Sequence, residues 1–351
     1  MYMTNLAAEA APRRDSEAEI LAQLYGGTPL GQAEAESLFG ALVRGDLDDP
    51  AIAAMLVALK VRGETTDELI GAARALRAAD LPFDRPDYLF ADSCGTGGDG
   101  SGTINLSTAV AFVAAAAGLP VAKHGNRSVT SRCGSADVLE QLGVKLDCAP
   151  DVSRRALDAA GICFLFAPMY HPGLRHAGPV RRALGIRTIM NIIGPCVNPA
   201  EPRVQLLGVA EERLLEPVAR TLAALGVERA MVVHGAGLDE VALHGETKAV
   251  RLGDGALEAL TIAPADVGFT TAPLTTIRGG DPAENAARLE ALLRGNGTRT
   301  ENEAVAINAG ALLFTAGKAA SLSEGAALAL DILASGAAHA RLEALIEISN
   351  G

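Results

Sequence analysis

The hydrophobic pattern of residues 16–80 has the period of amphipathic helices and carries almost no strand signal. Ser16 precedes the first periodic segment, and Thr65 or Thr66 precedes the last one, with Glu68 in its first turn. Hydroxyl side chains at these places are favoured helix caps. The pattern therefore predicts four helices that form a small helical domain, whose simplest role is packing or dimerisation.

The pattern changes after residue 87, where short apolar runs alternate with glycine loops and helices. An apolar run at 88–91 predicts a strand that leads into a glycine loop, and an Ala-rich helix then extends to Gly118. A second strand is predicted at 119–123, and residues 229–240 repeat the strand and glycine loop. These repeats indicate an α/β domain whose mainly parallel central sheet is flanked by helices, with ligand loops at the carboxyl ends of its strands.

Residues 166–199 are dense in Pro, Gly, Arg and His and are interpreted as a crossing between two domains. We expect the small helical domain to comprise residues 1–86, completed by 170–194. The large α/β domain is expected to comprise 87–169 and 195–351, with two Ala-rich helices near its end.

The composition narrows the range of partners. The 351 residues carry a formal net charge of -12, which disfavours nucleic acid and anionic membranes, so an anionic ligand needs a local basic pocket. Residues 104–122 are apolar, but polar and helix-breaking residues at both ends predict a buried helix in place of a membrane span. Five cysteines without metal-binding spacing, and no secretion signal, predict a cytoplasmic protein.

The glycine loop CGTGGDG (94–100) matches G-x-G-x-x-G, a pattern typical of dinucleotide sites. A dinucleotide fold also needs an acidic residue about 20 positions later, for the ribose hydroxyl. No Asp or Glu lies between Asp99 and Asp137. That window instead holds basic or potentially basic side chains: Lys123, His124, Arg127 and Arg132. A phosphate P-loop motif is also absent, so the sequence favours another, more anionic ligand.

Polar residues follow this loop at the predicted N-terminus of the Ala-rich helix: Asn105, Ser107 and Thr108. Helix N-termini and glycine turns both present N–H groups to phosphates. A helix cap needs only one such side chain, so we expect at least two of them to serve a ligand. Lys123 and Asn126 on the loop after the second strand add a charge and an amide.

Two adjacent carboxylates, Asp239 and Glu240, follow the predicted strand and glycine turn near residue 235. They suit Mg²⁺, which is usually held by one or two carboxylates together with substrate phosphates. A solvated turn is the plain alternative when this pair is considered by itself.

From about residue 20 to the C-terminus, the chain resembles the anthranilate phosphoribosyltransferase family. The resemblance rests on motifs in the family's order and spacing: GTGGDG and TINLST, KHGNRSVTS with GSADVLEQLG, FAPMYH with VRRALGIRT, IGP with NP, and the final HG and GLDE. The chain departs modestly from the family, for example at Gly102, where Asn is frequent.

The resemblance implies a homodimer through the helical domain and a ligand, 5-phosphoribosyl 1-pyrophosphate (PRPP), with two Mg²⁺ ions. It implies that these residues bind PRPP: Gly95, Gly98, Asp99, Thr103, Asn105, Leu106, Ser107, Thr108, Lys123, His124, Gly125, Asn126, Arg127, Ser128, Val129, Thr130, Ser131 and Ser135. For anthranilate it implies Gly95, His124, Asn126, His171 and Arg181, and for the metal Ser107, Asp239 and Glu240.

The resemblance implies transfer of the 5-phosphoribosyl group from PRPP to the amine of anthranilate with release of pyrophosphate, the second step of tryptophan biosynthesis. This reaction needs no catalytic side chain, because the amine of anthranilate is the nucleophile and the protein orients the reactants. Two alternatives stay open. Pyrimidine nucleoside phosphorylases share the general architecture, although this chain lacks their K-x-S-T-G-G loop. A non-enzymatic relative that binds anions or nucleic acid is the other, and the net charge argues against it.

Overall fold

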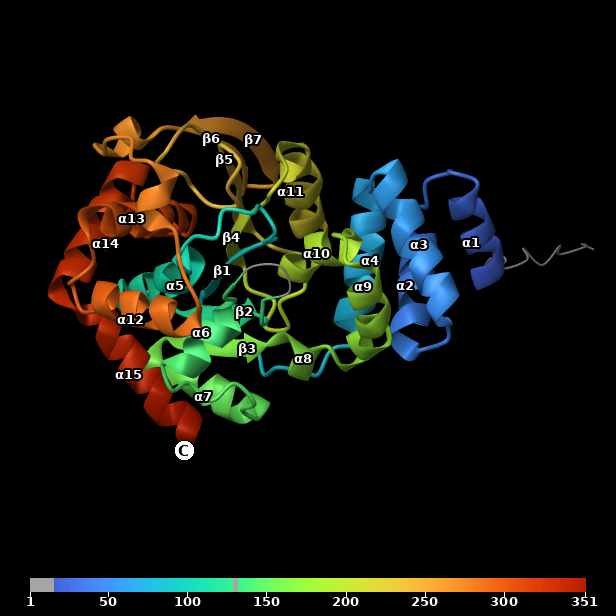
Figure 1. The fold of residues 1–351 in the computed structure, drawn as a ribbon, viewed down its shortest axis with the longest axis horizontal. Helices are drawn as coiled ribbons and strands as arrows, with labels where there is room; N and C mark the ends of the chain where they lie inside the picture. Colours follow the sequence, from blue (N-terminus) through green and yellow to red (C-terminus); the bar gives the residue numbers. More distant parts are fainter. Residues whose placement is uncertain (1–15, 129–131) are drawn as a thin grey trace, which may run out of the picture.

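The computed structural model describes residues 16–128 and 132–351, which form a helical unit beside a larger α/β unit (Figure 1). The first helices of the described chain are α1 (Glu17–Tyr25), α2 (Gln32–Arg44), α3 (Asp49–Arg62) and α4 (Thr66–Ala78). The Ser16 and Thr65 hydroxyls accept backbone N–H groups of Glu19 and Glu68, whose carboxylates accept the N–H of the cap residue in return. The predicted helices and their caps are confirmed.

Within the described ranges, a seven-stranded sheet crosses the α/β unit in the order β3-β2-β1-β4-β5-β6-β7. Its strands are β1 (Ala91–Gly95), β2 (Val121–Gly125), β3 (Ile162–Phe166), β4 (Val204–Gly208), β5 (Arg229–Gly235), β6 (Thr247–Gly253) and β7 (Ala256–Ile262). Strands β1 to β5 run parallel to one another, and β6 runs antiparallel to both of its neighbours, β5 and β7. The expected mainly parallel sheet is confirmed, but the antiparallel β6–β7 hairpin was not predicted.

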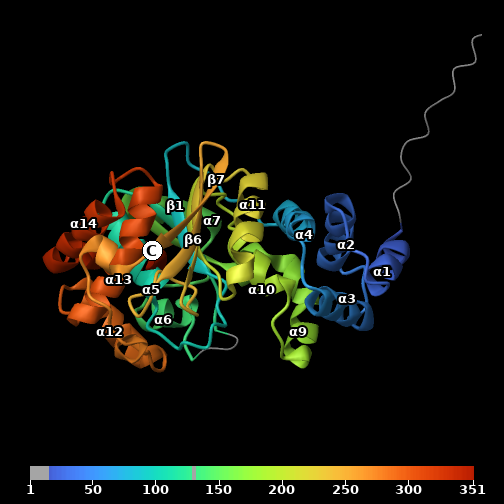
Figure 2. The same cartoon turned by 90° about the horizontal axis from the view of Figure 1, so that it is seen from above.

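The two faces of the sheet belong to two different cores. Helices lie on both sides of the sheet (Figure 2). One face is covered by α5 (Leu106–Ala116), α6 (Ser135–Gln141), α7 (Pro150–Ala160), α12 (Pro282–Leu293), α13 (Arg299–Thr315), α14 (Leu322–Ser335) and α15 (Ala337–Asn350). The other face is covered by α11 (Leu215–Ala224). Side chains alternate accordingly, since Leu206 belongs to the first core and Leu207 to the second.

The crossing between β3 and β4 folds as short helices: α8 (Ala167–Tyr170), η1 (Pro172–His176), α9 (Gly178–Leu184), α10 (Ile189–Ile193) and η2 (Gly194–Cys196). Among them, η1 packs against α2, α9 against α3, and α10 against α3 and α4. From α4, the Arg77 guanidinium donates to the carbonyls of Leu225 at 2.9 Å and Cys196 at 3.1 Å. The second core thus runs without interruption from the helical unit through the crossing and α11 to the sheet.

Strand positions near the cleft differ from the prediction. The first strand is β1, not 88–91, so it contains the fully buried Asp92. The Asn198 amide donates to this carboxylate at 2.9 Å, and the backbone N–H of His124 donates at 3.4 Å. An apolar pattern cannot reveal a buried polar residue whose partner is distant in sequence. The second strand likewise begins two residues later than predicted.

Short 3₁₀ turns complete the fold: η3 (Glu212–Leu214), η4 (Pro264–Val267) and η5 (Leu274–Ile277). Within the apolar stretch 104–122, residues 106–116 form the buried helix α5, as predicted, and the last two residues belong to β2. In the described part of the chain, no helix is long and apolar enough to cross a membrane.

Candidate active site

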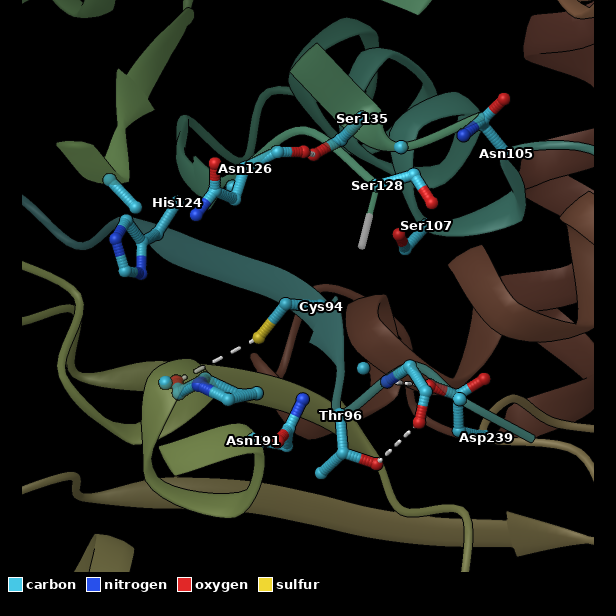
Figure 3. Close-up of a pocket in the computed structure, with 18 of the residues that line it drawn as sticks. Cys94, Thr96, Asn105, Ser107, His124, Asn126, Ser128, Ser135, Asn191 and Asp239 are labelled. Carbon is cyan, nitrogen blue, oxygen red and sulfur yellow. Dashed lines mark hydrogen bonds between the residues drawn. The ribbon is translucent and has the colours of Figure 1, made fainter. Parts of the chain in front are cut away.

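A cleft of about 340 Å³ lies at the carboxyl ends of β1 and β2. Figure 3 shows side chains of the loop after β1, the start of α5, the loop after β2 and helix α10 gathered around it. The cleft is lined by these residues that the sequence singled out: Gly95, Gly98, Asp99, Thr103, Asn105, Leu106, Ser107, Thr108, Lys123, His124, Gly125, Asn126, Arg127, Ser128, Ser135, His171, Arg181, Asp239 and Glu240. Val129, Thr130 and Ser131 lie outside the described residues.

The glycine loop after β1 needs its glycines for backbone conformation. Gly97, Gly98 and Gly100 have φ of 64°, 72° and 74°, in the left-handed region that disfavours other residues. The Asp99 carboxylate accepts both the N–H and the hydroxyl of Ser101 at 2.9 Å, which closes the turn. The loop is therefore a built turn whose backbone N–H groups can meet an anion.

The start of α5 has no side-chain cap. Asn105 stands at the cap position, but its amide instead donates to the Cys133 carbonyl at 3.3 Å and accepts from Asn285 at 3.0 Å. The backbone N–H of Ser107 bonds to the carboxylate of Glu240. Asn105 therefore connects loops, and the positive end of the α5 dipole lies at the cleft.

Lys123 brings a buried positive charge to the cleft. It is 2% exposed, and its ammonium donates to the Ser93 carbonyl at 2.6 Å and to the Ser107 hydroxyl at 3.2 Å. Among the described residues it forms no ion pair with a carboxylate. Its charge acts on the buried carboxylates of Asp92 and Glu240 without a direct ion pair, which leaves the ammonium placed for a phosphate-bearing ligand.

Asp239 and Glu240 form an acidic pair beside the glycine loop. The Asp239 carboxylate accepts the Gly97 N–H at 2.7 Å, and its own N–H donates to Asp99 at 3.3 Å. Burial and then the charge of Asp99 raise the pKa of Asp239 to about 7, and burial and then Asp239 raise the pKa of Glu240 to about 8.

This pair fits a hard cation that would neutralise it, together with the hydroxyl of Ser107. All three donors are oxygens, as Mg²⁺ prefers. The described residues contain no group of three or more His, Cys, Asp or Glu that could hold a metal by themselves. The residues therefore fit a magnesium ion whose remaining ligands come from substrate phosphates and water.

Two histidines form a buried polar chain that leads from the helical unit to the cleft. His171 Nδ1 bonds to Asp80, just after α4, and His171 Nε2 lies 3.0 Å from His124 Nε2. The ring of His124 also bonds to the Gly194 backbone. Burial, and then the charge of His171, lower the pKa of His124 well below its usual value. The His124 ring is held by His171 and by the Gly194 backbone, so it is suited to orienting its surroundings.

Arg181, on α9, is a cleft arginine without a partner among the described residues. Its guanidinium makes no ion pair or hydrogen bond there, and burial alone lowers its pKa. A guanidinium of this kind suits bidentate binding of a carboxylate. Asn126 accepts the Arg127 N–H at 2.7 Å through its side-chain oxygen, which leaves its NH₂ for a ligand.

The Arg127 side chain is engaged elsewhere. It pairs with Glu140 at 2.7 Å and with Asp137 at 3.3 Å, and its guanidinium lies over the Phe166 ring. Asp137 and Glu140 are the first acidic residues after residues 100–136, which contain no Asp or Glu. Asp137 also accepts the N–H groups of Ser128 at 2.9 Å and Gly134 at 2.8 Å, which closes the neck of the loop after β2.

Sequence reasoning missed other polar groups at the site. Asn191 on α10 lines the cleft, and its side-chain oxygen accepts the Thr188 N–H at 3.1 Å. Arg187 contacts the glycine loop through its guanidinium. Both lie in the crossing between β3 and β4. The motif VRRALGIRT contains Arg187 and was the sequence signal that could have identified it. Only the fold brings this segment to the end of β1.

The chain matches known proteins over nearly all of its length. Residues 87–339 match the "Glycosyl transferase family, a/b domain", and residues 18–79 match the "Glycosyl transferase family, helical bundle domain". The chain is 57% identical over 330 residues to the anthranilate phosphoribosyltransferase of Sorangium cellulosum. This alignment covers 94% of this chain and 95% of that protein.

Solved structures agree with this similarity. The crystal structure of anthranilate phosphoribosyltransferase from Thermus thermophilus has a TM-score of 0.90 and 44% identity, and covers 95% of this chain and 99% of that one. The Saccharomyces cerevisiae enzyme in complex with PRPP and Mg has a TM-score of 0.86 and 26% identity at the same coverage. Its complex with 4-fluoroanthranilate has a TM-score of 0.84 and 25% identity, also at that coverage. This chain therefore belongs to the anthranilate phosphoribosyltransferase family.

Proposed function

We propose that this chain transfers the 5-phosphoribosyl group of PRPP to the amine of anthranilate and releases pyrophosphate, the second step of tryptophan biosynthesis. The observation that carries the proposal is a pair of cations in one cleft: Lys123, whose ammonium is hydrogen-bonded to neutral oxygens, and Arg181, whose guanidinium has no carboxylate partner among the described residues. In a chain of net charge -12, such cations are suited to two anionic substrates. The names and ligands of the relatives support the same reaction.

In the proposed reaction the bond from C1 of ribose to pyrophosphate breaks, and a bond from C1 to the anthranilate nitrogen forms as that nitrogen loses a proton. No protein nucleophile is needed. Lys123 and the N-terminus of α5 stabilise the departing pyrophosphate, and Arg181 and Asn126 orient the acceptor. Ser107, Asp239 and Glu240 would hold two Mg²⁺ ions, which neutralise pyrophosphate charge when bound.

The assignment of residues to PRPP, anthranilate and metal is kept as part of this proposal. Within it, Arg127 contributes through its backbone, because its guanidinium is paired with acidic side chains. Asn105 supports the loops around PRPP through Cys133 and Asn285.

We also propose a cytoplasmic homodimer that forms through the helical domain. Tyr25 on α1 and Val61 on α3 are 50% and 82% exposed, and apolar side chains of this size suit an interface. All five cysteines are free thiols, as a reducing compartment would leave them. The proposed helical domain is 1–86 completed by 170–194, supported by the packing of the crossing helices on α2, α3 and α4.

The proposal is tested by mixing the purified chain with PRPP and Mg²⁺ and following anthranilate fluorescence. We expect the fluorescence to fall only when enzyme, PRPP and metal are all present. No loss under any condition would overturn the proposal. Phosphate-dependent release of base from thymidine would favour a nucleoside phosphorylase instead, and binding of labelled DNA at physiological salt would favour a non-enzymatic relative.

A further inference from the structure

Arg187 joins the crossing to the glycine loop. It lies between α9 and α10, and its guanidinium donates to the Gly98 carbonyl at 3.0 Å and to the Thr96 hydroxyl at 3.3 Å. The side chain also lies flat against the loop, because a Cβ added at Gly98 would meet Arg187 atoms at 2.8 to 2.9 Å. Arg187 therefore contacts the loop through hydrogen bonds and through packing.

The hydroxyl of Thr96 makes this contact part of a larger polar node. The same oxygen accepts the Ala210 N–H at 3.1 Å, and the Thr96 N–H donates to the Gly208 carbonyl at 2.9 Å. The end of β1, the end of β4 and the crossing thus meet at one hydroxyl. Arg187 is the charged member of this node.

Arg187 forms no direct ion pair with a described carboxylate. The guanidinium is half-buried, and its field opposes the rise in the pKa of Asp239. The charge of Arg187 also acts on Glu211, while its N–H groups hold the neutral oxygens of the anion-binding turn.

We propose that Arg187 is a positioning residue, which holds the glycine loop in its PRPP-binding conformation by bridging Gly98 and Thr96. Its guanidinium also fixes the loop to the segment that carries Arg181, so the halves of the cleft for the two substrates keep a constant relative placement. This inference rests on the proposed function, because it assumes that the glycine loop binds PRPP.

The test compares Arg187→Gln and Arg187→Lys with the control Arg182→Gln. Arg182 is an exposed arginine of the same crossing, and it has no hydrogen bond or ion pair to a described residue. PRPP affinity is measured by calorimetry in Mg²⁺, and the KM of each substrate by anthranilate fluorescence. We expect Arg187→Gln to weaken PRPP binding about tenfold or more, since it loses bonds made by a charged donor. Arg187→Lys keeps the charge but cannot span both acceptors, so an intermediate effect is expected.

A further readout separates positioning from general destabilisation. Hydrogen exchange of residues 96–101 should be faster in Arg187→Gln than in wild type or Arg182→Gln, at an unchanged melting temperature. PRPP binding within about twofold of wild type in Arg187→Gln would overturn the inference. If Arg187→Gln does not fold, the same criterion applies to Arg187→Lys. Failure of the proposed function is distinct, since wild type would then neither bind PRPP nor consume anthranilate.

Discussion

Replacing Arg181 with Gln tests whether this unpaired guanidinium binds the carboxylate of anthranilate. Gln keeps a hydrogen-bond donor but removes the charge and the bidentate geometry. Hydrogen bonds to charged groups contribute about 1.5–3 kcal/mol, so the KM for anthranilate should rise about 10-fold to 150-fold. The KM for PRPP should change little, because PRPP is proposed to lie on the glycine loop and at the start of α5.

The same substitution should not destabilise the fold. Arg181 has no described carboxylate partner, so its removal leaves no buried unpaired acid, which is the usual large cost of breaking an ion pair. Burial already disfavours its charged form. The melting temperature of Arg181→Gln should therefore equal that of wild type or exceed it.

The assay follows anthranilate fluorescence at saturating PRPP, beside thermal unfolding of the same samples. Arg182→Gln is the matched control on α9, with an exposed side chain, and should behave as wild type. A KM for anthranilate that stays within about twofold of wild type would refute the reasoning. Equal increases in the KM of both substrates would also refute it, because they would indicate a general distortion of the cleft.

Three other outcomes follow from the structure. In the metal-free chain, Asp239 and Glu240 carry protons in the folded state, with pKa near 7 and 8, that the unfolded chain releases near 3.8 and 4.5. Their contribution to the free energy of unfolding should therefore fall as pH rises from about 5 to 8. Mg²⁺ should for this reason raise the melting temperature more at about pH 8 than at about pH 5. In Asp239→Asn, the Mg²⁺-induced rise in melting temperature should differ less between these two pH values. Gly102→Asn should keep wild-type PRPP affinity, because Asn tolerates the left-handed φ of 58° and no atom lies near the new Cβ. Gly98→Ala should weaken PRPP binding, because Ala is strained at a φ of 72° and an arginine atom lies 2.8 Å from the new Cβ. Calorimetry with PRPP measures both affinities. Gly71→Ala places a Cβ 2.3 Å from a backbone carbonyl of α2 and should lower the free energy of unfolding in urea by about 1–3 kcal/mol; an unchanged urea midpoint would contradict the tight α2–α4 packing.

Local signals made the helical unit predictable. The hydroxyls of Ser16 and Thr65 are each followed three residues later by Glu, and in the structure both form capping boxes. Such a signal needs only the residues within one turn. The glycine loop was likewise readable, because its positive φ values demand glycine wherever the loop lies.

Features that depend on distant partners were not predictable from this sequence. β1 contains the buried Asp92, whose carboxylate is satisfied by Asn198, more than 100 positions away. The side-chain oxygen of Asn105 accepts from Asn285, a contact that the sequence did not reveal, and its role toward a ligand stays a prediction. Arg187 reaches the loop only after the crossing has folded back onto the sheet. Side-chain pairing of this kind follows from the tertiary fold and leaves no periodic signal.

The second core has a consequence for how this chain can be divided. One apolar cluster contains Leu207 of the sheet and side chains of α11, the crossing helices and α4. Arg77 of α4 adds hydrogen bonds to the carbonyls of Leu225 and Cys196. A cut at residue 86 would therefore remove α4 from α11 and α10, and it would expose the apolar faces of α11 and of the crossing helices. The helical unit is consequently no detachable module: a chimera that exchanges it between relatives must carry the crossing and the α4–α11 contact with it.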